Sequence, residues 1–598
     1  MKNQNYKISI SRTYADAMKG NLKSNLSKPS PMISPLKAKA FLEMFQIYGF
    51  RLISLSLYSV SSKIHSRVKL FHNFGNFLLV MTKRNGITYT VKYLKACQLA
   101  IQKKIAGQPL ESLRELEPDL PLPRLTKSGL PRFIQLRDRR AISSGSLSVI
   151  RMWLTMFAIY RVIKIPIVPK LSTITNPFSG DPQYLREFER IIPRGMSKFR
   201  SFVKFDRRTG VGLGKQTSLL PILKAGGGYH VSLGKLLVLP KTFHESGLWE
   251  PLLRFVDLSG NQLLTSQLIR LNNLHSLAMT AFGGSTGVSE TLLGKLSFKE
   301  EAAGKLRVFA IVDCITQSAL FGLHQWLFDV LRRIPNDGTF NQEAAFSRAQ
   351  DKAKLSGCSF GYDLSAATDR LPISLQVTIL SYWFGDEFAK LWHELLVNRD
   401  YIVVPASEKA SEWRKSIASG PYRYAVGQPM GAYSSWAMLA VTHHFIVQWA
   451  HHLAYPRKSL REWFTGYELL GDDIVIFDRL VAAKYREIML ALGVEINLSK
   501  SVVSNPGSLV EFAKRTSFKG VDVSAVSIKM LQAALDAKSK VQVAMYLSMK
   551  TGRMMSNHLK ALFSLGPSHL YKMENLPSVV RKAESSVIMQ MLKTDWSN

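Results

Sequence analysis

The chain has 598 residues, of which 46% are hydrophobic, so it can fold around a substantial core and is not of the disordered class. A formal net charge of +36 predicts a polyanionic partner, and long nucleic acid is the natural candidate because neutralising many phosphates releases counterions. Three cysteines exclude a disulfide scaffold. No apolar run has the length of a bilayer span, so we expect no stable membrane insertion.

The N-terminal part of the chain is strongly basic. Residues 1–40 are rich in Lys, Ser and Asn and predict a basic flexible arm, either a tail that contacts RNA or a mitochondrial transit peptide. From Met44 to Leu110 there is no Asp or Glu while Lys and Arg recur, so residues 41–170 are predicted to be a basic region that faces an anionic partner. A Pro-rich connection around Leu113–Arg140 is interpreted as a boundary.

A basic extended segment follows near residue 305. Lys305 and Arg307 alternate with apolar residues, so both cations would point to one face of a strand. Such a pair can hold a triphosphate; the alternative is an edge strand protected by charge. Beyond it, Leu323–Ile334 is predicted to be a helix and Pro335–Gln342 a tight turn.

The first acidic segment is Ser359–Pro372. It predicts an apolar strand that ends at Asp363, a loop of small residues, and a helix from Ile373 to Phe384 opened by proline. Asp369, one loop beyond the strand, would face the sugar of an incoming nucleotide; alternatively, it is an acid stabilised by a helix N-terminus.

A Gly-rich loop, Gly427–Trp436, leads into a long predicted helix. Its backbone N–H groups could meet phosphate or sugar, beginning with Gly427, and Ser434 or Ser435 could hydrogen-bond a ribose 2′-hydroxyl. His443 and His444 are adjacent, so they face different sides of the helix and are predicted to serve packing rather than chelation.

The second acidic segment, Tyr467–Phe477, predicts a β-hairpin whose turn is Gly471-Asp472-Asp473. Adjacent carboxylates repel each other, and a divalent cation makes them favourable; an acidic surface turn is the alternative. Asp363 could join Asp472 and Asp473 around two metal ions suited to phosphoryl transfer.

The chain after the hairpin predicts an amphipathic helix, Ala482–Leu492, and then a strand, Val494–Leu498. Lys500, just beyond, could protonate a departing pyrophosphate as a general acid; the alternative is a solvated surface lysine. From Ser524 to the end the pattern is mostly helical.

The order of these segments resembles the palm and fingers of viral RNA-dependent RNA polymerases. There the basic strand, the Asp-x₅-Asp segment, the Gly-rich loop and the Gly-Asp-Asp hairpin are motifs F, A, B and C, with motif D near Lys500 and motif E near Glu511–Arg515. The closer resemblance is to the mitoviruses, which are capsidless RNA viruses of fungal mitochondria. The stretches that resemble the sequences of that family are Asn176–Gly180, Arg307–Asp313, Pro335–Gln342, Asp363–Pro372 and Gly427–Trp436.

The resemblance implies an α+β right-hand polymerase, with fingers over residues 171–350, a palm with an inserted fingers segment over 351–515, and a mostly helical thumb over 516–598. It implies that RNA is copied into RNA from ribonucleoside triphosphates inside a host mitochondrion; the oligomeric state stays open. Two Mg²⁺ or Mn²⁺ ions would be held by Asp363, Asp472 and Asp473. Lys500 would act as acid, and nucleotide contacts would come from Lys305, Arg307, Asp369, Gly427, Ser434 and Ser435. RNA contacts would come from Lys299, Gly431, Lys514 and Arg515.

Two alternatives stay open at this point. A reverse transcriptase would use a bulky side chain near the sugar to exclude ribonucleotides, whereas Asp369 is polar and better suited to receive a 2′-hydroxyl. A non-catalytic RNA-binding protein derived from a polymerase would share the basic charge but would not need all the acids and the motif order.

Overall fold

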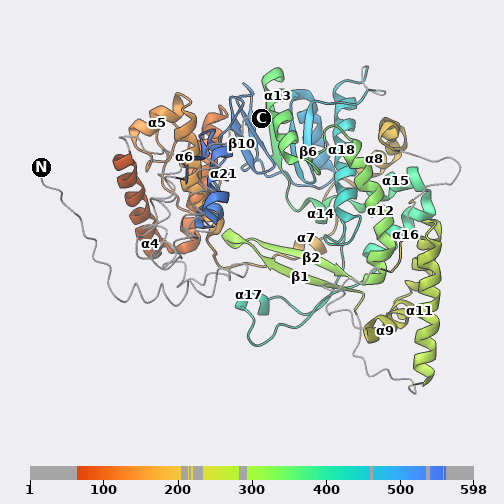
Figure 1. Cartoon of the computed structure of the whole chain (residues 1–598). Helices are drawn as coiled ribbons and strands as arrows, with labels where there is room; N and C mark the ends of the chain where they lie inside the picture. Colours follow the sequence, from red (N-terminus) through yellow and green to blue (C-terminus); the bar gives the residue numbers. More distant parts are fainter. Residues whose placement is uncertain are drawn as a thin grey trace, which may run out of the picture.

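The computed structural model describes residues 64–203, 213, 217–219, 233–281, 292–457, 462–533, 539–556 and 558–559. Helices predominate in this part of the chain, and the strands form three small sheets (Figure 1). The mixture of helices with mainly antiparallel strands agrees with the predicted α+β class. The predicted arm at residues 1–40 lies outside the described residues.

The central sheet has the strand order β6-β7-β3-β8 and is antiparallel throughout. The strands are β3 (Ser359–Asp363), β6 (Tyr467–Leu470), β7 (Asp473–Ile476) and β8 (Val502–Ser504). The predicted strand end at Asp363 and the predicted hairpin are therefore confirmed. After Asp473, β7 is apolar at every position because both of its faces are covered. Ile474 and Ile476 lie in the larger core, and Val475 packs against α13 (Gln342–Ser356).

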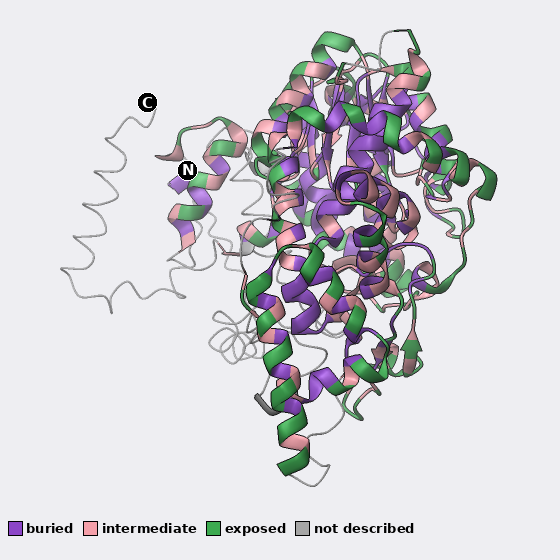
Figure 2. Ribbon diagram, turned by 90° about the vertical axis from the view of Figure 1, so that its right-hand side faces the viewer, coloured by how far each residue is buried: buried purple, intermediate pink, exposed green. Residues whose placement is uncertain are grey.

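The larger core lies between this sheet and a group of helices. Figure 2 shows the buried residues concentrated in the interior of this part of the molecule, with exposed residues on the outer helices. The helices that contribute to it include α8 (Pro182–Gly195), α9 (Leu233–Glu245), α10 (Trp249–Leu258), α11 (Gln262–Ala281), α12 (Cys314–Arg333), α15 (Ile373–Phe384), α16 (Asp386–Val397), α18 (Ser435–Ala454) and α19 (Arg479–Ala491). α18 is buried on all sides from Ala437 to Ala450 because it runs through the middle of this core.

A second sheet, β2-β1-β4-β5, lies below the central sheet in the view of Figure 1. Its longest part is the hairpin of β1 (Gly294–Glu300) and β2 (Leu306–Val312), joined by the short helix η5 (Ala302–Gly304). The short strands β4 (Tyr401–Val403) and β5 (Gly420–Tyr422) complete it, and α17 (Glu412–Lys415) lies between them in sequence. The register places Lys299 opposite Arg307.

The second hydrophobic core joins the two ends of the described chain. Its N-terminal elements are α4 (Ile64–Ile105), η2 (Leu113–Glu115), α5 (Leu136–Ser143), α6 (Leu147–Phe157) and η3 (Ala158–Val162); its C-terminal helices are α20 (Ile528–Ala533) and α21 (Lys540–Thr551). Leu113, Leu130 and Ile134 are buried in this same core. The Pro-rich connection is therefore packed against α4 and does not form the predicted boundary.

The third sheet, β11-β10-β9, lies beside the central one. It consists of β9 (Leu509–Phe512), β10 (Arg515–Phe518) and β11 (Val521–Asp522), so the region predicted as a helical thumb begins with strands. Helices follow from Ile528 within the described residues. The remaining short helices are α7 (Ser172–Thr175), η4 (Met196–Phe202) and α14 (Ala367–Arg370).

The structure differs from the sequence-based prediction at three local segments. The helix predicted from Leu323 begins at Cys314, because the Asp313 carboxylate accepts the N–H of Thr316 and caps it. The loop of small residues after Asp363 contains the single turn of α14. Val494–Leu498 is not a strand: Ile496 alone bridges to Leu364, and the Asn497 side chain accepts hydrogen bonds from Ser499 and Lys500 that favour a turn.

Among the described residues no single helix is long and apolar enough to cross a bilayer. By length and composition alone, one pair bent by 118° passes the same test, Leu136–Ser143 with Leu147–Val162. In this structure Trp153, Met156 and Phe157 of that pair are buried in the second core.

Candidate active site

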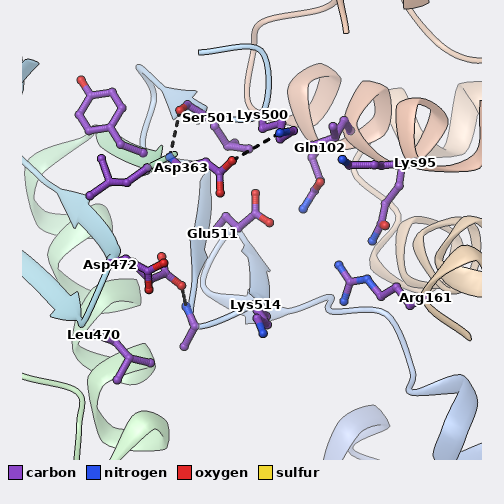
Figure 3. Close-up of a pocket in the computed structure, with 18 of the residues that line it drawn as sticks. Lys95, Gln102, Arg161, Asp363, Leu470, Asp472, Lys500, Ser501, Glu511 and Lys514 are labelled. Carbon is purple, nitrogen blue, oxygen red and sulfur yellow. Dashed lines mark hydrogen bonds and ion pairs between the residues drawn. The ribbon is translucent and has the colours of Figure 1, made fainter. Parts of the chain in front are cut away.

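A cavity of about 590 Å³ opens where the two cores meet (Figure 3). Its walls come from the ends of β3 and β7, the segment from Lys500 to Lys514, the start of β2, and the helices α4 and η3. Four carboxylates line it: Asp363, Asp472, Asp473 and Glu511. Six cations line it as well: Lys95, Arg161, Lys305, Arg307, Lys500 and Lys514.

The strand register brings the distant acids together. Asp363 at the end of β3 is paired directly with Asp473 at the start of β7, and Asp472 is the preceding turn residue. The Asp363 side chain is 53% exposed, and its Oδ2 lies 4.0 Å from Lys500 Nζ. The backbone N–H of Asp363 donates to Ser501 Oγ (3.1 Å), and Asp473 Oδ2 accepts the N–H of Ala513 (2.9 Å). The predicted meeting of these acids at one cavity is thus present.

Side chains of α18 contact the turn that carries Asp472. Gly471 has φ +62°, and a Cβ there would lie 2.8 Å from Trp436 Nε1, so both backbone and space favour glycine. The carbonyl of Gly471 accepts a hydrogen bond from His443 Nδ1 (2.8 Å). Burial lowers the pKa of His443 to about 4, so the ring is neutral and its Nε2 accepts from the Tyr485 hydroxyl (2.7 Å). The prediction that His443 serves packing is confirmed.

The second histidine of the pair is also bound inside the protein. His444 is fully buried, with Nδ1 2.8 Å from the Tyr467 hydroxyl and Nε2 3.1 Å from Asp337 Oδ2. The two rings therefore serve different parts of the core, as the prediction required.

Burial and mutual repulsion raise the pKa values of the acids. Burial raises the pKa of Asp473 to about 7, with Glu511, Asp472 and Asp363 adding to the shift and the Ala513 N–H opposing it. Burial likewise raises the pKa of Glu511 to about 7, against a hydrogen bond from Gln102 and the charge of Arg161. Burial raises the pKa of Asp363, and Lys500 is the foremost group opposing that shift. These carboxylates lack full compensation, which a divalent cation would supply.

The donor set suits a hard cation, because Mg²⁺ prefers carboxylate oxygens and usually takes one or two of them together with water and substrate phosphates. Asp363, Asp472 and Asp473 offer such oxygens. In the described part of the chain no group of three or more His, Cys, Asp or Glu side chains is gathered closely enough to enclose one ion by itself.

The predicted phosphate-binding cations reach the cavity from the start of β2. Lys305 precedes β2 and Arg307 lies within it, and both side chains line the cavity. Arg307 Nε also donates to Glu301 Oε1 (3.0 Å). Lys299 is exposed on the neighbouring strand β1, opposite Arg307, and does not line the cavity. Lys514 lines it with a backbone φ of +59°.

Asp369 does not line the cavity, and of the Gly-rich loop only Trp436, its last residue, does. The carbonyl of Asp369 accepts the N–H of Gly427 (3.0 Å), and a Cβ on Gly427 would lie 2.2 Å from Thr368 O. Burial raises the pKa of the Asp369 carboxyl, while a hydrogen bond with Thr173 opposes the shift. In this structure the acid connects α14 to α7, and its predicted contact with a sugar stays a prediction.

The motif B serines are buried within the fold. Ser434 Oγ accepts the indole N–H of Trp392 (2.9 Å), and its backbone N–H donates to His324 Nδ1 (3.1 Å). Ser435 is 1% exposed. Neither side chain reaches the cavity here, so their contact with a 2′-hydroxyl also stays a prediction.

Two residues predicted to contact RNA are occupied by structural contacts. A Cβ on Gly431 would lie 2.2 Å from Ala310 O, so the loop passes close to β2. The Arg515 guanidinium pairs with Glu343 and with Asp522 (2.7 Å) and lies 4.1 Å from the centre of the Phe346 ring. Neither lines the cavity.

Sequence reasoning missed part of the site. Glu511 was noted only as the start of motif E, although its carboxylate faces the aspartates. Lys95 and Arg161 were not singled out, and Gln102 carried no signal at all. The acid-free stretch from Met44 to Leu110 marked the region of Lys95 as basic, but it gave no reason to choose this lysine.

Carboxylates at the edge of an antiparallel sheet, facing a set of cations across one cavity, define a site suited to phosphate esters and divalent cations. Residues 216–592 match the family model described as mitovirus RNA-dependent RNA polymerase, and the chain belongs to this family. The family resemblance drawn from the motifs is thereby confirmed.

Curated relatives agree with this assignment. The chain is 32% identical over 451 residues to the RNA-directed RNA polymerase of Cryphonectria parasitica mitovirus 1, a match that covers 72% of this chain and 50% of that protein. Two uncharacterized mitochondrial proteins of Arabidopsis thaliana are similar over shorter stretches. One is 43% identical over 33% of this chain and 75% of its own length, the other 34% identical over 29% and 78%. The chain thus spans about half the length of the viral polymerase it matches.

Proposed function

We propose that the protein is an RNA-dependent RNA polymerase that extends RNA on an RNA template with ribonucleoside triphosphates. The observation that supports this most strongly is the direct pairing of Asp363 with Asp473, next to Asp472, at a cavity that also contains Lys305 and Arg307. Membership of the mitovirus polymerase family points to the same reaction.

The proposed fold assignment follows the right-hand plan. The central sheet with α18 and α19 would form the palm over residues 351–515, with an inserted fingers segment, and the β1–β2 hairpin with the helices of residues 171–350 would form the fingers. Residues 516–598 would form the thumb. The antiparallel order β6-β7-β3-β8, with the acids at one edge, supports the palm assignment.

In the proposed chemistry Asp363, Asp472 and Asp473 would hold Mg²⁺ or Mn²⁺, as a pair of ions. Bound cations of this kind would lower the pKa of the attacking hydroxyl and neutralise charge on the leaving group. Lys305 and Arg307 would bind the triphosphate through charge-assisted hydrogen bonds. Lys500, whose Nζ lies 4.0 Å from Asp363 Oδ2, would hold the proton that the departing pyrophosphate takes up.

The proposed partners are RNA, as template and product, and ribonucleoside triphosphates. The net charge of +36 supports binding to long RNA. We further propose that the protein acts in the host mitochondrion, since its viral relative is a mitovirus polymerase and its plant relatives are named mitochondrial proteins.

Primer extension tests this function. Purified protein, a primed RNA template and ribonucleotides should give extended RNA with Mg²⁺ or Mn²⁺ present and none after chelation. Preference for deoxyribonucleotides on the same primed template would contradict the proposal in favour of reverse transcription. RNA binding without synthesis in any divalent metal would favour a non-catalytic RNA-binding protein.

A further inference from the structure

The wall of the cavity opposite the aspartates comes from the N-terminal helices, outside the segment matched by the family model. α4 contributes Lys95 and Gln102, and η3 contributes Arg161. Figure 3 shows these three side chains extending from the helices toward Asp363 and Glu511. A cavity assembled from the matched segment alone would lack this wall.

The wall is fastened to the catalytic segment on both sides of its cations. Lys103 Nζ donates to Ser501 O (3.0 Å), next to Lys500, and the Ser508 hydroxyl donates to Ile105 O (3.2 Å). Gln102 Nε2 donates to Thr516 Oγ1 (3.0 Å), two residues beyond Lys514. α4 is therefore held at a fixed place relative to the acids.

Lys95 and Arg161 lie near acids without forming an ion pair with any of the described ones. Within the described residues neither side chain is within 4.0 Å of a carboxylate, and Arg161 Nε donates only a long bond to the Tyr160 hydroxyl (3.4 Å). Burial and then the nearby Lys500 lower the pKa of Lys95, with Glu117 and Asp363 partly offsetting the shift. Cations collected in this way are stabilised by a bound anion.

The cavity is large enough for a nucleotide. Its volume of about 590 Å³ is typical of a pocket for a small ligand. The same cavity already contains Lys305 and Arg307. A polyphosphate in the cavity would therefore have Lys305 and Arg307 near it in addition to the cations of the N-terminal wall.

We propose that Lys95 and Arg161 bind the polyphosphate of the incoming nucleotide and the pyrophosphate product. This inference rests on the proposed function and adds a phosphate-binding surface from a part of the chain that the family model does not cover. Lys95 would bind from α4 and Arg161 from η3, on the side of the cavity across from the carboxylates.

The test compares Lys95→Gln and Arg161→Gln with Lys83→Gln, which removes the same charge from an exposed site on α4 outside the cavity. Lys92 is unsuitable as the control, because its removal would free Glu117, 3.4 Å away, to attract Lys95. In primer extension we expect each cavity variant to raise the KM for ribonucleotides roughly tenfold and to weaken pyrophosphate inhibition by about the same factor. The affinity for primed RNA should change less than about twofold.

Additional measurements make the outcome decisive. Lys95→Arg keeps the charge and should retain a KM near that of the wild type, and because Arg161 is exposed, Arg161→Gln should leave thermal unfolding unchanged. Unchanged KM and pyrophosphate inhibition in an active protein would overturn this inference alone. Weaker RNA binding at unchanged KM would overturn it in favour of a contact with the RNA backbone. No synthesis by the wild type would overturn the proposed function and this inference together.

Discussion

The two hydrophobic cores contribute to the cavity in different ways. The larger core is formed by residues between Ile174 and Val494. It places the aspartates through local geometry, because Asp363 at the end of one strand is the direct partner of Asp473 at the start of the next. The second core joins residues 70–163 to residues 502–559, and its wall is placed only by packing between chain segments far apart in sequence. The aspartates, which need exact mutual placement, therefore lie on one sheet, whereas Lys95 and Arg161, which act at longer range, are supplied by a docked neighbour.

The largest expected effect concerns the aspartates. Asp472→Asn should reduce RNA synthesis by at least about 10³-fold and leave RNA affinity almost unchanged, because the lost charge belongs to the proposed cation site. The residue is exposed, so thermal unfolding should also be unchanged. Primer extension, filter binding and a melting curve measure the three quantities.

The matched control for this variant is Asp351→Asn, which makes the same change at an exposed acid of α13 outside the cavity. It should behave as the wild type. Equal synthesis by the Asp472 and Asp351 variants would contradict the assignment of catalysis to the sheet. The cavity would then be at most an RNA-binding site.

The next effect tests how firmly the larger core holds its turn. His443→Leu leaves the buried Gly471 carbonyl and the Tyr485 hydroxyl without their partner, so the free energy of unfolding should fall by about 2–3 kcal/mol. Synthesis per folded molecule should fall as well, since the turn carries Asp472. Tyr485→Phe removes one of the two bonds and should cost about 1 kcal/mol. Equal losses in both variants would show that the bond to Gly471 contributes nothing.

A pH series tests the two acids whose pKa values are raised to about 7. Asp473 and Glu511 have pKa values raised to about 7, so below that pH protons compete with the cation. The apparent affinity for Mg²⁺, followed by its effect on the melting temperature, should rise roughly tenfold between pH 6 and 7 and level off above pH 8. A flat response across this range would contradict cation binding at these carboxylates.

The same pKa shifts determine how the free energy of unfolding of the cation-free protein changes with pH. Between the ordinary carboxyl pKa of roughly 4 and the raised value near 7, the folded state binds more protons than the unfolded state. The contribution of these groups to the free energy of unfolding therefore decreases as pH rises through that window. Added Mg²⁺ should offset the loss most strongly at pH 8. Glu511→Gln, which removes one titrating group, should make the decrease shallower.

The smallest effect concerns the contact between the cores. Gln102→Ala removes the hydrogen bond to Thr516 together with the one to Glu511, and should lower the free energy of unfolding by about 1 kcal/mol, with a modest rise in the KM for ribonucleotides. Gln98→Ala truncates the same type of side chain one turn earlier on α4 and serves as the control. A larger loss from Gln98 than from Gln102 would show that this bond does not secure the wall.

The sequence predicted the sheet edge well because the relevant signals are local. A strand that ends at Asp363 and a hairpin at Gly471 can each be recognised from about ten residues. Where a side chain competed with the backbone, the prediction failed: Asp313 starts a helix early, and Asn497 turns an alternating segment away from strand pairing.

The cavity wall could not be predicted in this way. The hydrogen bond from Lys103 to Ser501 joins residues 398 positions apart, and no pattern near either residue indicates the other. Asp369 and Ser434 show the reverse limitation. Their motifs were recognisable, yet packing directs Asp369 toward Thr173 and Ser434 toward Trp392 in this structure.

The second core has a consequence for the order of events during translation. Its N-terminal helices emerge from the ribosome early, but the residues that complete their packing, from Val523 to Leu559, emerge only after the whole sheet has been made. Until then the part of this core that those residues cover stays exposed and vulnerable to aggregation or chaperone capture, although α4 and α6 can already pack against each other. The nascent chain thus acquires its aspartates before the packing that holds the N-terminal wall of the cavity is complete.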